Sequence, residues 1–191
     1  MRKIGFLLVL GMAMILPFLS ASCDSAPTGS ANLPTATPTP CAGTFGQPVT
    51  AGGSGYANFG TGYTWYSAYN LTQAGAITAI AANVPSTSTQ LAVGVYTNNA
   101  AMPQSLIANS ATVTTGVSGW VTVGFGPVNL SAGTYWLALA LPSTSPAGNI
   151  GINTSAANFY GSASIFPTVF TNDNSQSYEM SVVAFYQHTC P

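Results

Sequence analysis

The sequence predicts an all-β domain, an antiparallel β-sandwich of the jelly-roll type, behind an N-terminal leader and a linker. Beyond the leader and linker, short segments in which apolar residues alternate with Thr, Ser, Asn or Gly recur roughly every ten residues. Gly, Pro, Asn and Ser separate these segments and supply turn chemistry. No segment keeps a helical period over three turns, so we expect no helix in this part of the chain.

Residues 1–22 have the order of a secretory signal peptide. A basic pair at 2–3 precedes an apolar stretch at 4–19, and small residues close the segment. Cys23 follows these small residues and resembles the lipobox cysteine of bacterial lipoproteins, with the difference that Leu19 lies four residues before it instead of three.

The lipobox resemblance implies that Cys23 carries a diacylglyceryl group and becomes the N-terminus of the mature protein. The protein is then exported and held by lipid at the outer face of a bacterial membrane, so the membrane is its first expected partner. Two alternatives stay open. One is ordinary secretion with Cys23 free or paired between chains, and the other is retention of the apolar stretch as a membrane helix.

Residues 23–40 form a predicted linker. Pro, Thr, Ser and Ala dominate it, and Thr alternates with Pro toward its end. Such a composition favours an extended polyproline II conformation and cannot supply a hydrophobic core. We therefore expect a spacer that holds a domain at 41–191 away from the membrane.

The first part of that domain contains three expected strands. Residues 63–71 alternate and place most of their aromatic residues on one face. Residues 77–84 follow a Gln-Ala-Gly turn, and residues 91–96 place three aliphatic side chains on one face. The Asn pair at 98–99 and the Pro-Ser-Thr-Ser-Pro segment at 142–146 are expected loops.

The second part of the domain contains the remaining strands. They are expected at 111–115, 120–125, 133–141, 149–153 and 178–187. In 133–141 the alternation turns Tyr135, Leu137, Leu139 and Leu141 inward. Trp136 is left on the opposite face of that strand.

Two cysteines bracket the domain. Cys41 precedes the expected strands and Cys190 follows them. Where the first and last strands of a sandwich are neighbours, two such sulfur atoms can meet, and export provides an oxidising compartment. We predict a Cys41–Cys190 disulfide. Closing so long a loop stabilises the domain by about 5 kcal/mol in the chain-entropy model, which is an upper value.

Three stretches carry a family resemblance: 93–108 (VGVYTNNAAMPQSLIA), 119–123 (GWVTV) and 127–138 (PVNLSAGTYWLA). They resemble a module of many secreted bacterial proteins, in which a strand ending in Tyr-Thr, a Pro turn, a Gly-Trp strand and a Gly-Thr-Tyr-Trp strand follow one another. The resemblance implies a jelly-roll or carbohydrate-binding-like β-sandwich with an accessory, non-catalytic role. Met102-Pro103 departs from the Gly-x-Pro order of the family, so we expect that turn to differ.

Charge is almost absent from this chain. Charged residues make up 3% of it, and no Lys or Arg follows Lys3. Contacts to nucleic-acid phosphates need such cations, so we expect no nucleic-acid partner. The domain contains one Asp, one Glu and one His, namely Asp173, Glu179 and His188, and no Gly-x-Ser-x-Gly motif. We therefore expect no enzyme, and a hydrolase based on Asp173 and Glu179 is the least favoured alternative.

No cofactor is expected, with structural calcium as the one exception considered. The side chains of Asn172, Asp173, Asn174 and Glu179 offer the oxygen ligands that a hard cation prefers. No calcium-loop pattern accompanies them, so a solvated turn is the simpler interpretation.

Aromatic residues give the strongest functional indication. Their faces can stack on sugar rings, while Asn, Ser and Thr can hydrogen-bond sugar hydroxyls without any charge. A sandwich core also uses aromatic residues, and Trp65 belongs to the core by its face. Trp136 and Tyr66 lie on the face opposite the main apolar set of their strands. Together with Trp120, they are the residues that we expect to be exposed for ligand stacking.

These observations predict a non-enzymatic, surface-exposed lipoprotein whose β-sandwich binds polysaccharide or another neutral extracellular polymer. The alternative is a structural or adhesive envelope protein that self-associates, because its strands lack the Lys and Glu residues that normally protect sheet edges. The two hypotheses differ in the partner, which is a glycan in the first and a second copy of this chain in the second.

Overall fold

The computed structural model describes residues 40–48, 54–145, 149–153, 159–176 and 178–190. The chain divides into two units, 1–36 and 37–191, and all described residues belong to the second. The predicted signal peptide, Cys23 and the linker up to residue 39 lie outside the described residues, so the lipid anchor stays a prediction. Within the described part of the chain, no helix is long and apolar enough to cross a membrane.

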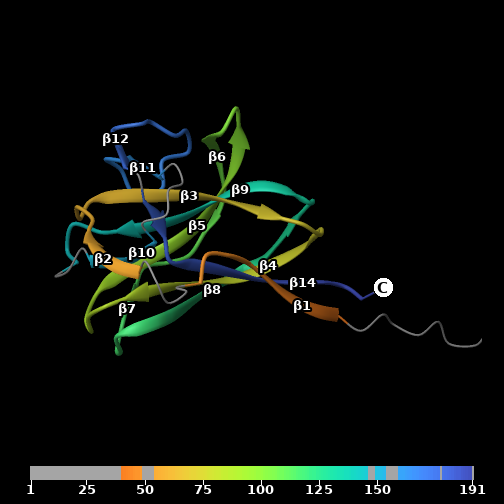
Figure 1. The fold of residues 1–191 in the computed structure, drawn as a ribbon, viewed down its shortest axis with the longest axis horizontal. Coiled ribbons are helices and arrows are strands. Elements are labelled where there is room, and N and C mark those ends of the chain that lie inside the picture. Colours follow the sequence, from red (N-terminus) through yellow and green to blue (C-terminus); the bar gives the residue numbers. More distant parts are fainter. Residues whose placement is uncertain (1–39, 49–53, 146–148, 154–158, 177, 191) are drawn as a thin grey trace, which may run out of the picture. The chain divides into compact units, whose positions relative to one another are not determined.

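The domain is an antiparallel β-sandwich with two main sheets, as predicted (Figure 1). The four-stranded sheet contains, in spatial order, β1 (Pro40–Gly46), β14 (Val182–Thr189), β4 (Gly75–Val84) and β8 (Gly119–Leu130). The facing sheet contains β12 (Asn174–Gln176), β11 (Phe159–Ser162), β3 (Tyr63–Leu71), β9 (Gly133–Leu141), β5 (Gln90–Asn99) and β6 (Met102–Asn109), with β7 (Val113–Thr114) also paired to β5. We call this second sheet the β3–β9–β5 sheet.

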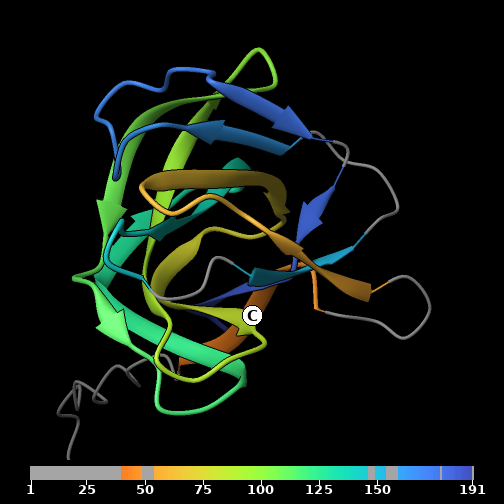
Figure 2. The ribbon, with the colours of Figure 1, turned by 90° about the vertical axis from the view of Figure 1, so that its left-hand side faces the viewer.

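A smaller sheet closes one end of the sandwich. It contains β13 (Glu179–Met180), β10 (Asn149–Asn153) and β2 (Ser54–Asn58). β13 is separated from β14 by Ser181 alone, so the small sheet continues from the end of the four-stranded one. Figure 2 shows β10 and β2 crossing in front of the strands behind them.

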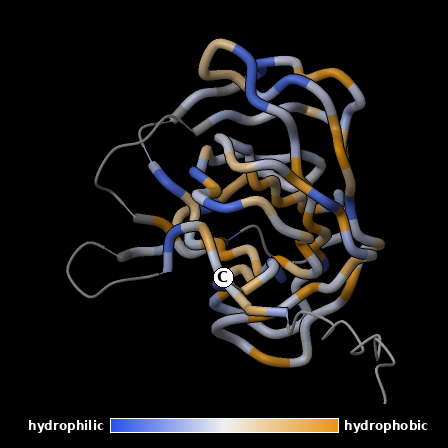
Figure 3. The backbone as a smooth tube through the Cα atoms, turned by 90° about the vertical axis from the view of Figure 1, so that its right-hand side faces the viewer, coloured by the Kyte–Doolittle hydropathy of each residue, from blue (hydrophilic) through white to orange (hydrophobic). Residues whose placement is uncertain are grey.

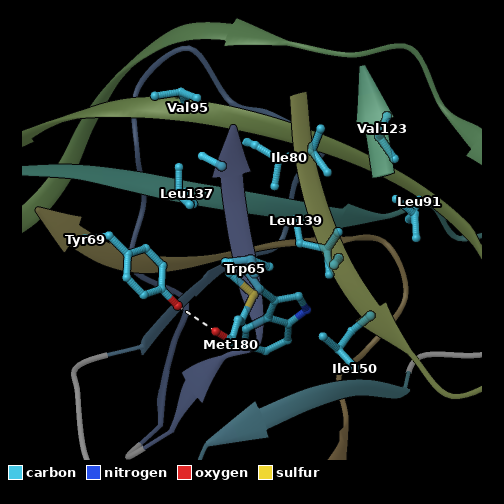
Figure 4. Packing of buried hydrophobic residues seen from close by; sticks show 14 of the residues in the cluster. Trp65, Tyr69, Ile80, Leu91, Val95, Val123, Leu137, Leu139, Ile150 and Met180 are labelled. Carbon is cyan, nitrogen blue, oxygen red and sulfur yellow. Dashed lines mark hydrogen bonds between the residues drawn. The ribbon is translucent and has the colours of Figure 1, made fainter. Parts of the chain in front are cut away.

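The main core lies between the two large sheets (Figure 4). The β3–β9–β5 sheet contributes seven fully buried aliphatic side chains, which are Leu71, Leu91, Val93, Val95, Leu137, Leu139 and Leu141. The four-stranded sheet contributes Ile77, Ile80, Val182 and Ala184 to the same core. Each large aliphatic side chain that is removed from water stabilises the fold by about 1.5–3 kcal/mol. Tyr69 also enters this core, where its hydroxyl donates to the carbonyl oxygen of Met180 at 2.6 Å.

β4 contains a β-bulge at Thr78. In the ladders with both β14 and β8, the pairing runs from Ile77 directly to Ala79. A bulge shifts the alternation by one residue, so Ile77 and Ile80 both face the core although they are three residues apart. On the β8 side the irregularity includes Pro127, which has no amide hydrogen to donate and is tolerated at an irregular edge strand.

The strands predicted at 63–71, 133–141 and 149–153 are observed with those bounds. Four more predictions match strands that are longer or shorter than expected, and the segment 178–187 is divided between β13 and β14. Five strands were not predicted, namely β1, β2, β6, β11 and β12. Each of these strands is short or contains several Gly, Asn, Ser or Pro residues, whose side chains give little alternating hydrophobic pattern.

The loop predicted at 98–99 was wrong. Asn98 and Asn99 end β5 and pair with β6, and the hairpin turns at Ala100 and Ala101 instead. Both alanines have positive φ, at 48° and 62°, as a two-residue hairpin of the right twist requires. The left-handed region costs a residue such as alanine about 1–2 kcal/mol, and asparagine adopts it more readily. Residue preferences alone therefore predicted the turn at the asparagines instead of the alanines.

The predicted disulfide between Cys41 and Cys190 is present, with the two Cα atoms 5.2 Å apart. β1 and β14 are direct neighbours, and Pro40 pairs with Thr189 at this end of the ladder. The disulfide therefore ties the edge strand β1 to the end of β14. It joins positions 149 residues apart in sequence.

The outer face of the β3–β9–β5 sheet is covered by a second apolar layer. The segment between β11 and β12, residues 163–173, crosses this face and reaches β6, where Val169 bridges to Ser105 (Figure 2). We call this segment the strap. Phe166 and Phe170 of the strap pack with Tyr66, Tyr96 and Trp136 from the sheet below.

Hydrogen bonds fasten the strap at both ends and in the middle. The Thr64 hydroxyl donates to the Ser164 carbonyl and accepts from the Phe166 amide, both at 2.8 Å. The Tyr96 hydroxyl donates to the Pro167 carbonyl at 2.8 Å. Asp173 closes the loop, because its Oδ2 accepts from the Ala163 amide at 2.8 Å.

Gly94 on β5 makes room for the strap. A Cβ atom at this position would lie 2.8 Å from a ring carbon of Phe166 and 3.1 Å from the carbonyl oxygen of Ala108. Any side chain at position 94 would therefore displace Phe166, and with it the cover of the second apolar layer.

The first prediction concerns the disulfide. Replacing both cysteines (Cys41→Ser with Cys190→Ser) should lower the free energy of unfolding by up to about 5 kcal/mol, because the unfolded chain loses a long covalent loop. Denaturant unfolding of the wild type with and without reductant gives the same comparison without mutation. Equal midpoints in oxidised and reduced protein would contradict the prediction.

The second prediction concerns the strap. Gly94→Val should destabilise the domain by about 1–3 kcal/mol, as overpacking does, and should expose Phe166 and Phe170 to chymotrypsin. Gly124→Val is the matched control, because a Cβ at 124 meets only the Thr78 carbonyl oxygen, at 3.9 Å. Equal cleavage rates in the two variants would show that Phe166 does not depend on the space above Gly94.

Candidate functional site

A groove of about 460 Å³ opens where β2 leads into β3. Its lining is largely aromatic and consists of Ala57, Asn58, Phe59, Gly60, Tyr63, Trp65 and Tyr178. Three short segments of chain build it: the end of β2 with the turn after it, the start of β3, and the residue before β13. A concave, aromatic site with a few polar groups is the usual form of a small-ligand site.

The aromatic rings of the groove form one packed group. Tyr63 stacks on Trp65 with ring centroids 5.5 Å apart and planes inclined by 24°. The Phe59 ring centroid lies 5.2 Å from that of Trp65, with the two planes inclined by 42°. Phe59 and Trp65 are each 3% exposed, whereas Tyr63 and Tyr178 are half-buried. Phe59 and Trp65 thus form a rigid base, and the two tyrosines present ring surface to solvent.

The groove owes its shape to glycines at two points. Gly62 turns the chain into β3 with a φ of 85°, and its amide donates to the Leu141 carbonyl at 2.6 Å. Gly161 on β11 lies directly against the Trp65 ring, and a Cβ there would be 2.4 Å from a ring carbon. The Trp65 indole nitrogen also donates to the Gly60 carbonyl at 3.4 Å. These contacts fix the Trp65 ring in place before any ligand arrives.

The polar groups that line the groove are neutral. They are the Asn58 amide, the hydroxyls of Tyr63 and Tyr178, and the local backbone, and the lining includes no Asp, Glu, Lys, Arg or His among the described residues. Such a surface offers ring faces and hydrogen-bonding groups to a ligand without attracting ions. Figure 3 shows hydrophilic and hydrophobic stretches interspersed along the backbone of the domain, and charged residues make up 3% of the chain.

The expectation that Trp136 and Tyr66 are exposed for stacking was wrong. They do lie on the face opposite the main core, but the strap covers that face, and they are 1% and 0% exposed. The Trp136 indole nitrogen donates to Asn98 Oδ1 at 2.9 Å, so its polar group is satisfied within the domain. Alternation along a strand cannot show that a distant segment folds over its outer face.

Trp120 is exposed as expected, with 42% of its surface accessible. It lies near the start of β8, on the outer face of the four-stranded sheet, and therefore away from the aromatic groove. The three residues predicted for stacking do not form one site.

The proposed calcium ligands divide between two places. Asp173 ends the strap, and its Oδ2 accepts from the Ala163 amide and the Thr171 hydroxyl, at 2.8 and 3.1 Å. Glu179 belongs to β13, and Asn172 is exposed beside Asp173. The Asn174 side chain lies outside the described residues. Within the described part of the chain, no group of three or more His, Cys, Asp or Glu residues could hold a metal ion.

Burial shifts the pKa of several groups. Removal from water raises the pKa of the Glu179 carboxyl. The same cause raises the pKa of Tyr96 to about 12 and raises the pKa of Tyr66 further. Tyr66 and Tyr96 belong to the layer under the strap, so both stay neutral at physiological pH. None of these groups lines the aromatic groove.

Sequence reasoning did not identify Phe59, Tyr63 and Tyr178 as groove residues. Tyr63 and Trp65 were placed together on the core face, which is correct, but that face opens to solvent at the start of β3. Tyr178 was placed in a strand, at its first residue. An aromatic residue at a strand end next to a glycine-rich turn is the feature that would have suggested an accessible ring.

No protein-family model matches the chain, and no curated protein matches it. Among solved structures, the chain is similar to the clostridial cysteine protease Cwp84 after propeptide cleavage, with a TM-score of 0.58 and 13% identity over 78% of this chain and 40% of that one. It is also similar to a structure of the cysteine protease and lectin-like domains of Cwp84, a surface layer associated protein of Clostridium difficile, with a TM-score of 0.51 and 12% identity over 66% of this chain and 32% of that one. At such identities the likeness shows the fold alone, and the chain spans less than half the length of either structure.

The third prediction follows from Glu179. Because its folded pKa is raised, its contribution to stability is present below the ordinary Glu pKa and is lost as the pH rises through the raised value. Glu179→Gln should therefore gain stability relative to the wild type between about pH 4 and about pH 7. Denaturant unfolding at the two pH values measures this difference.

Asp173→Asn is the contrasting control for that measurement. The Asp173 carboxylate accepts hydrogen bonds from the Ala163 amide and the Thr171 hydroxyl. The neutral side-chain amide of Asn should accept these bonds less strongly, so the variant should be less stable than the wild type at neutral pH. A stability difference between Glu179→Gln and the wild type that does not change with pH would contradict the assignment for Glu179.

Proposed function

We propose that the domain is a non-enzymatic binding module for a neutral extracellular polysaccharide, and that the aromatic groove is its binding site. The single observation that carries this proposal is the groove lining, in which Tyr63 and Tyr178 present ring surface over the fixed base of Phe59 and Trp65. Sugar rings have apolar faces and many hydroxyl groups, and this lining offers aromatic faces together with neutral hydrogen-bonding groups.

The comparisons support a binding role without identifying a ligand. One similar structure contains a lectin-like domain of a surface layer associated protein. That structure also contains a cysteine protease domain, and the match covers 32% of it. We infer a binding role for this chain because its own structure contains an aromatic groove.

The proposed location is the outer face of a bacterial membrane. The leader at 1–22, the lipobox-like Cys23 and the linker at 23–40 favour an exported, lipid-anchored protein. The Cys41–Cys190 disulfide fits an oxidising compartment. On this proposal the linker holds the groove away from the membrane and toward extracellular polymers.

The positions and contacts of Asp173, Glu179 and His188 support a non-enzymatic role. Asp173 accepts hydrogen bonds that close the strap, and Glu179 lies on β13. His188 is on β14 beside Tyr186, and its Nδ1 lies 3.0 Å from the Thr189 carbonyl oxygen. None of the three lines the aromatic groove, so a ligand there meets no general acid or base among the described residues.

The fourth prediction tests the groove. Tyr63→Ala and Tyr178→Ala should each weaken binding to a neutral oligosaccharide by about tenfold, which corresponds to about 1.4 kcal/mol for one lost aromatic contact. Tyr63→Phe should retain most of the affinity because the ring face remains. Affinity measured by titration calorimetry against a panel of soluble gluco-, manno-, xylo- and chito-oligosaccharides checks both expectations.

Val169→Ala is the control for this series, because Val169 is 68% exposed on the strap and lies outside the groove lining. Raising the salt concentration should leave the affinity unchanged, since no ion pair contributes. Wild-type affinity in Tyr63→Ala and Tyr178→Ala would refute the groove as the site, and no binding across the panel would refute the ligand class.

A further inference from the structure

The two large sheets differ in how their edge strands are covered. β1 has seven residues, begins with a proline and is joined to its neighbour β14 by the disulfide. The strap covers β6, where the Phe170 amide donates to the Gln104 carbonyl at 3.2 Å. β8 has twelve residues, and among the described strands only β4 pairs with it. β8 is therefore the longest edge strand that the described part of the chain leaves open.

The hydrogen-bond pattern shows which backbone groups of β8 face this open edge. Asn83 on β4 pairs with Trp120, and the Asn83 amide donates away from β8, to the Ser181 carbonyl at 3.1 Å. Along an antiparallel ladder, pairs that bond to each other alternate with pairs whose N–H and C=O groups all point away. The register of β8 with β4 is regular from residue 119 to residue 124. The amides and carbonyls of Trp120, Thr122 and Gly124 therefore point to the open edge.

The side chains of this edge segment, residues 119–124 (GWVTVG), offer nothing that would repel another strand. Trp120, Thr122 and Gly124 are exposed on the outer face of the sheet, and β8 contains no charged residue. Long edge strands are normally protected by charge, proline or a bulge. The only proline of β8, Pro127, follows this segment and lies at the irregularity opposite Thr78. The segment is thus a straight, neutral and accessible strand edge.

A second copy of the same segment matches this edge in shape and in hydrogen bonding. In an antiparallel pair with its two-fold axis at Thr122, Thr122 lies opposite Thr122 of the second copy, and Trp120 lies opposite Gly124. Each backbone group that faces the edge then has a partner. A Cβ at Gly124 would meet only the Thr78 carbonyl oxygen, at 3.9 Å, so the space above this glycine is open to the Trp120 ring of the other copy. An aromatic residue opposite a glycine and two threonines opposite each other are both favourable cross-strand pairs.

We propose that residues 119–124 form the interface of a homodimer, in which the four-stranded sheets of two copies join into one continuous sheet. Each copy has one such edge, so the two-fold pairing closes at the dimer and does not continue into a fibre. The partner is a second copy because this segment supplies both the unpaired strand and the Trp120–Gly124 match. No residue of the segment lines the aromatic groove, so the dimer does not rest on the proposed function.

Sedimentation equilibrium of the full chain in a mild detergent tests the dimer through position 122. Thr122→Lys and Thr122→Glu should each be monomeric, because two like charges would lie directly opposite each other. An equal mixture of these two variants should dimerise again, and added salt should weaken that mixed dimer. Thr122→Val should dimerise like the wild type, because it keeps the backbone bonds and a β-branched side chain.

Further variants separate the interface from the fold. Thr122→Pro should be a folded monomer, because the amide hydrogen that it removes points away from β4. Trp120→Ala should weaken dimerisation about tenfold through the lost ring contact with Gly124. Tyr56→Ala is the matched control, because Tyr56 is an aromatic residue of β2 with 56% of its surface exposed, and it should leave dimerisation unchanged.

The possible outcomes decide for or against this interface. A wild-type dimer that is lost in Thr122→Lys and in Thr122→Glu and restored in their mixture would support it. A wild-type protein that stays monomeric up to about 1 mM would overturn it. A dimer that persists in Thr122→Lys, or an assembly that grows beyond the dimer, would also overturn it. Loss of oligosaccharide binding in Tyr63→Ala concerns the groove alone and should leave the dimer intact.

Discussion

The structure depends on one constraint, namely that the central strands β3, β9 and β5 are buried on both faces. Their inner face forms the main core with Leu137, Leu139 and Leu141, and their outer face carries Tyr66, Tyr96 and Trp136 under the strap. A sheet buried on both sides needs a cover on each. The four-stranded sheet covers one side, and the strap, fastened through Thr64 and Asp173, covers the other. Because both covers are in place, the aromatic residues at the start of β3 are held rigidly where the groove opens.

The scarcity of charged residues determines which groups make the polar contacts of this domain. Buried polar side chains are hydroxyls and amides, and they bond mainly to the backbone. The Ser67 hydroxyl accepts from the Met180 amide at 3.0 Å, and the Ser110 hydroxyl accepts from the Val93 amide at 3.0 Å. Such bonds are insensitive to salt and to moderate changes of pH. The same neutrality defines the proposed groove, whose affinity should come from ring contact and hydrogen bonding.

The sequence was sufficient for the fold class, the disulfide and the inward faces of the long strands. Alternation over 63–71 and 133–141 was strong because those strands combine aromatic and aliphatic residues with small polar ones. The hairpin at Ala100-Ala101 and the strand β6 were missed because local propensity favours a turn at the asparagines, whereas strand pairing decides the register. The burial of Trp136 and Tyr66 was missed for a different reason. It depends on the strap, whose Phe166 and Phe170 are 30 to 104 residues away from them in sequence, and no local pattern reports such a contact.

We propose that neutral sugars bind in the groove beside Trp65. The chain has three tryptophans, and each indole N–H gives its own signal in a nitrogen-edited NMR spectrum. Trp65 forms the base of the groove, whereas Trp136 is buried under the strap. Titration with a soluble neutral oligosaccharide that the chain binds should shift the Trp65 indole signal saturably and leave that of Trp136 unchanged. An unmoved Trp65 signal throughout a titration in which binding occurs would contradict the account.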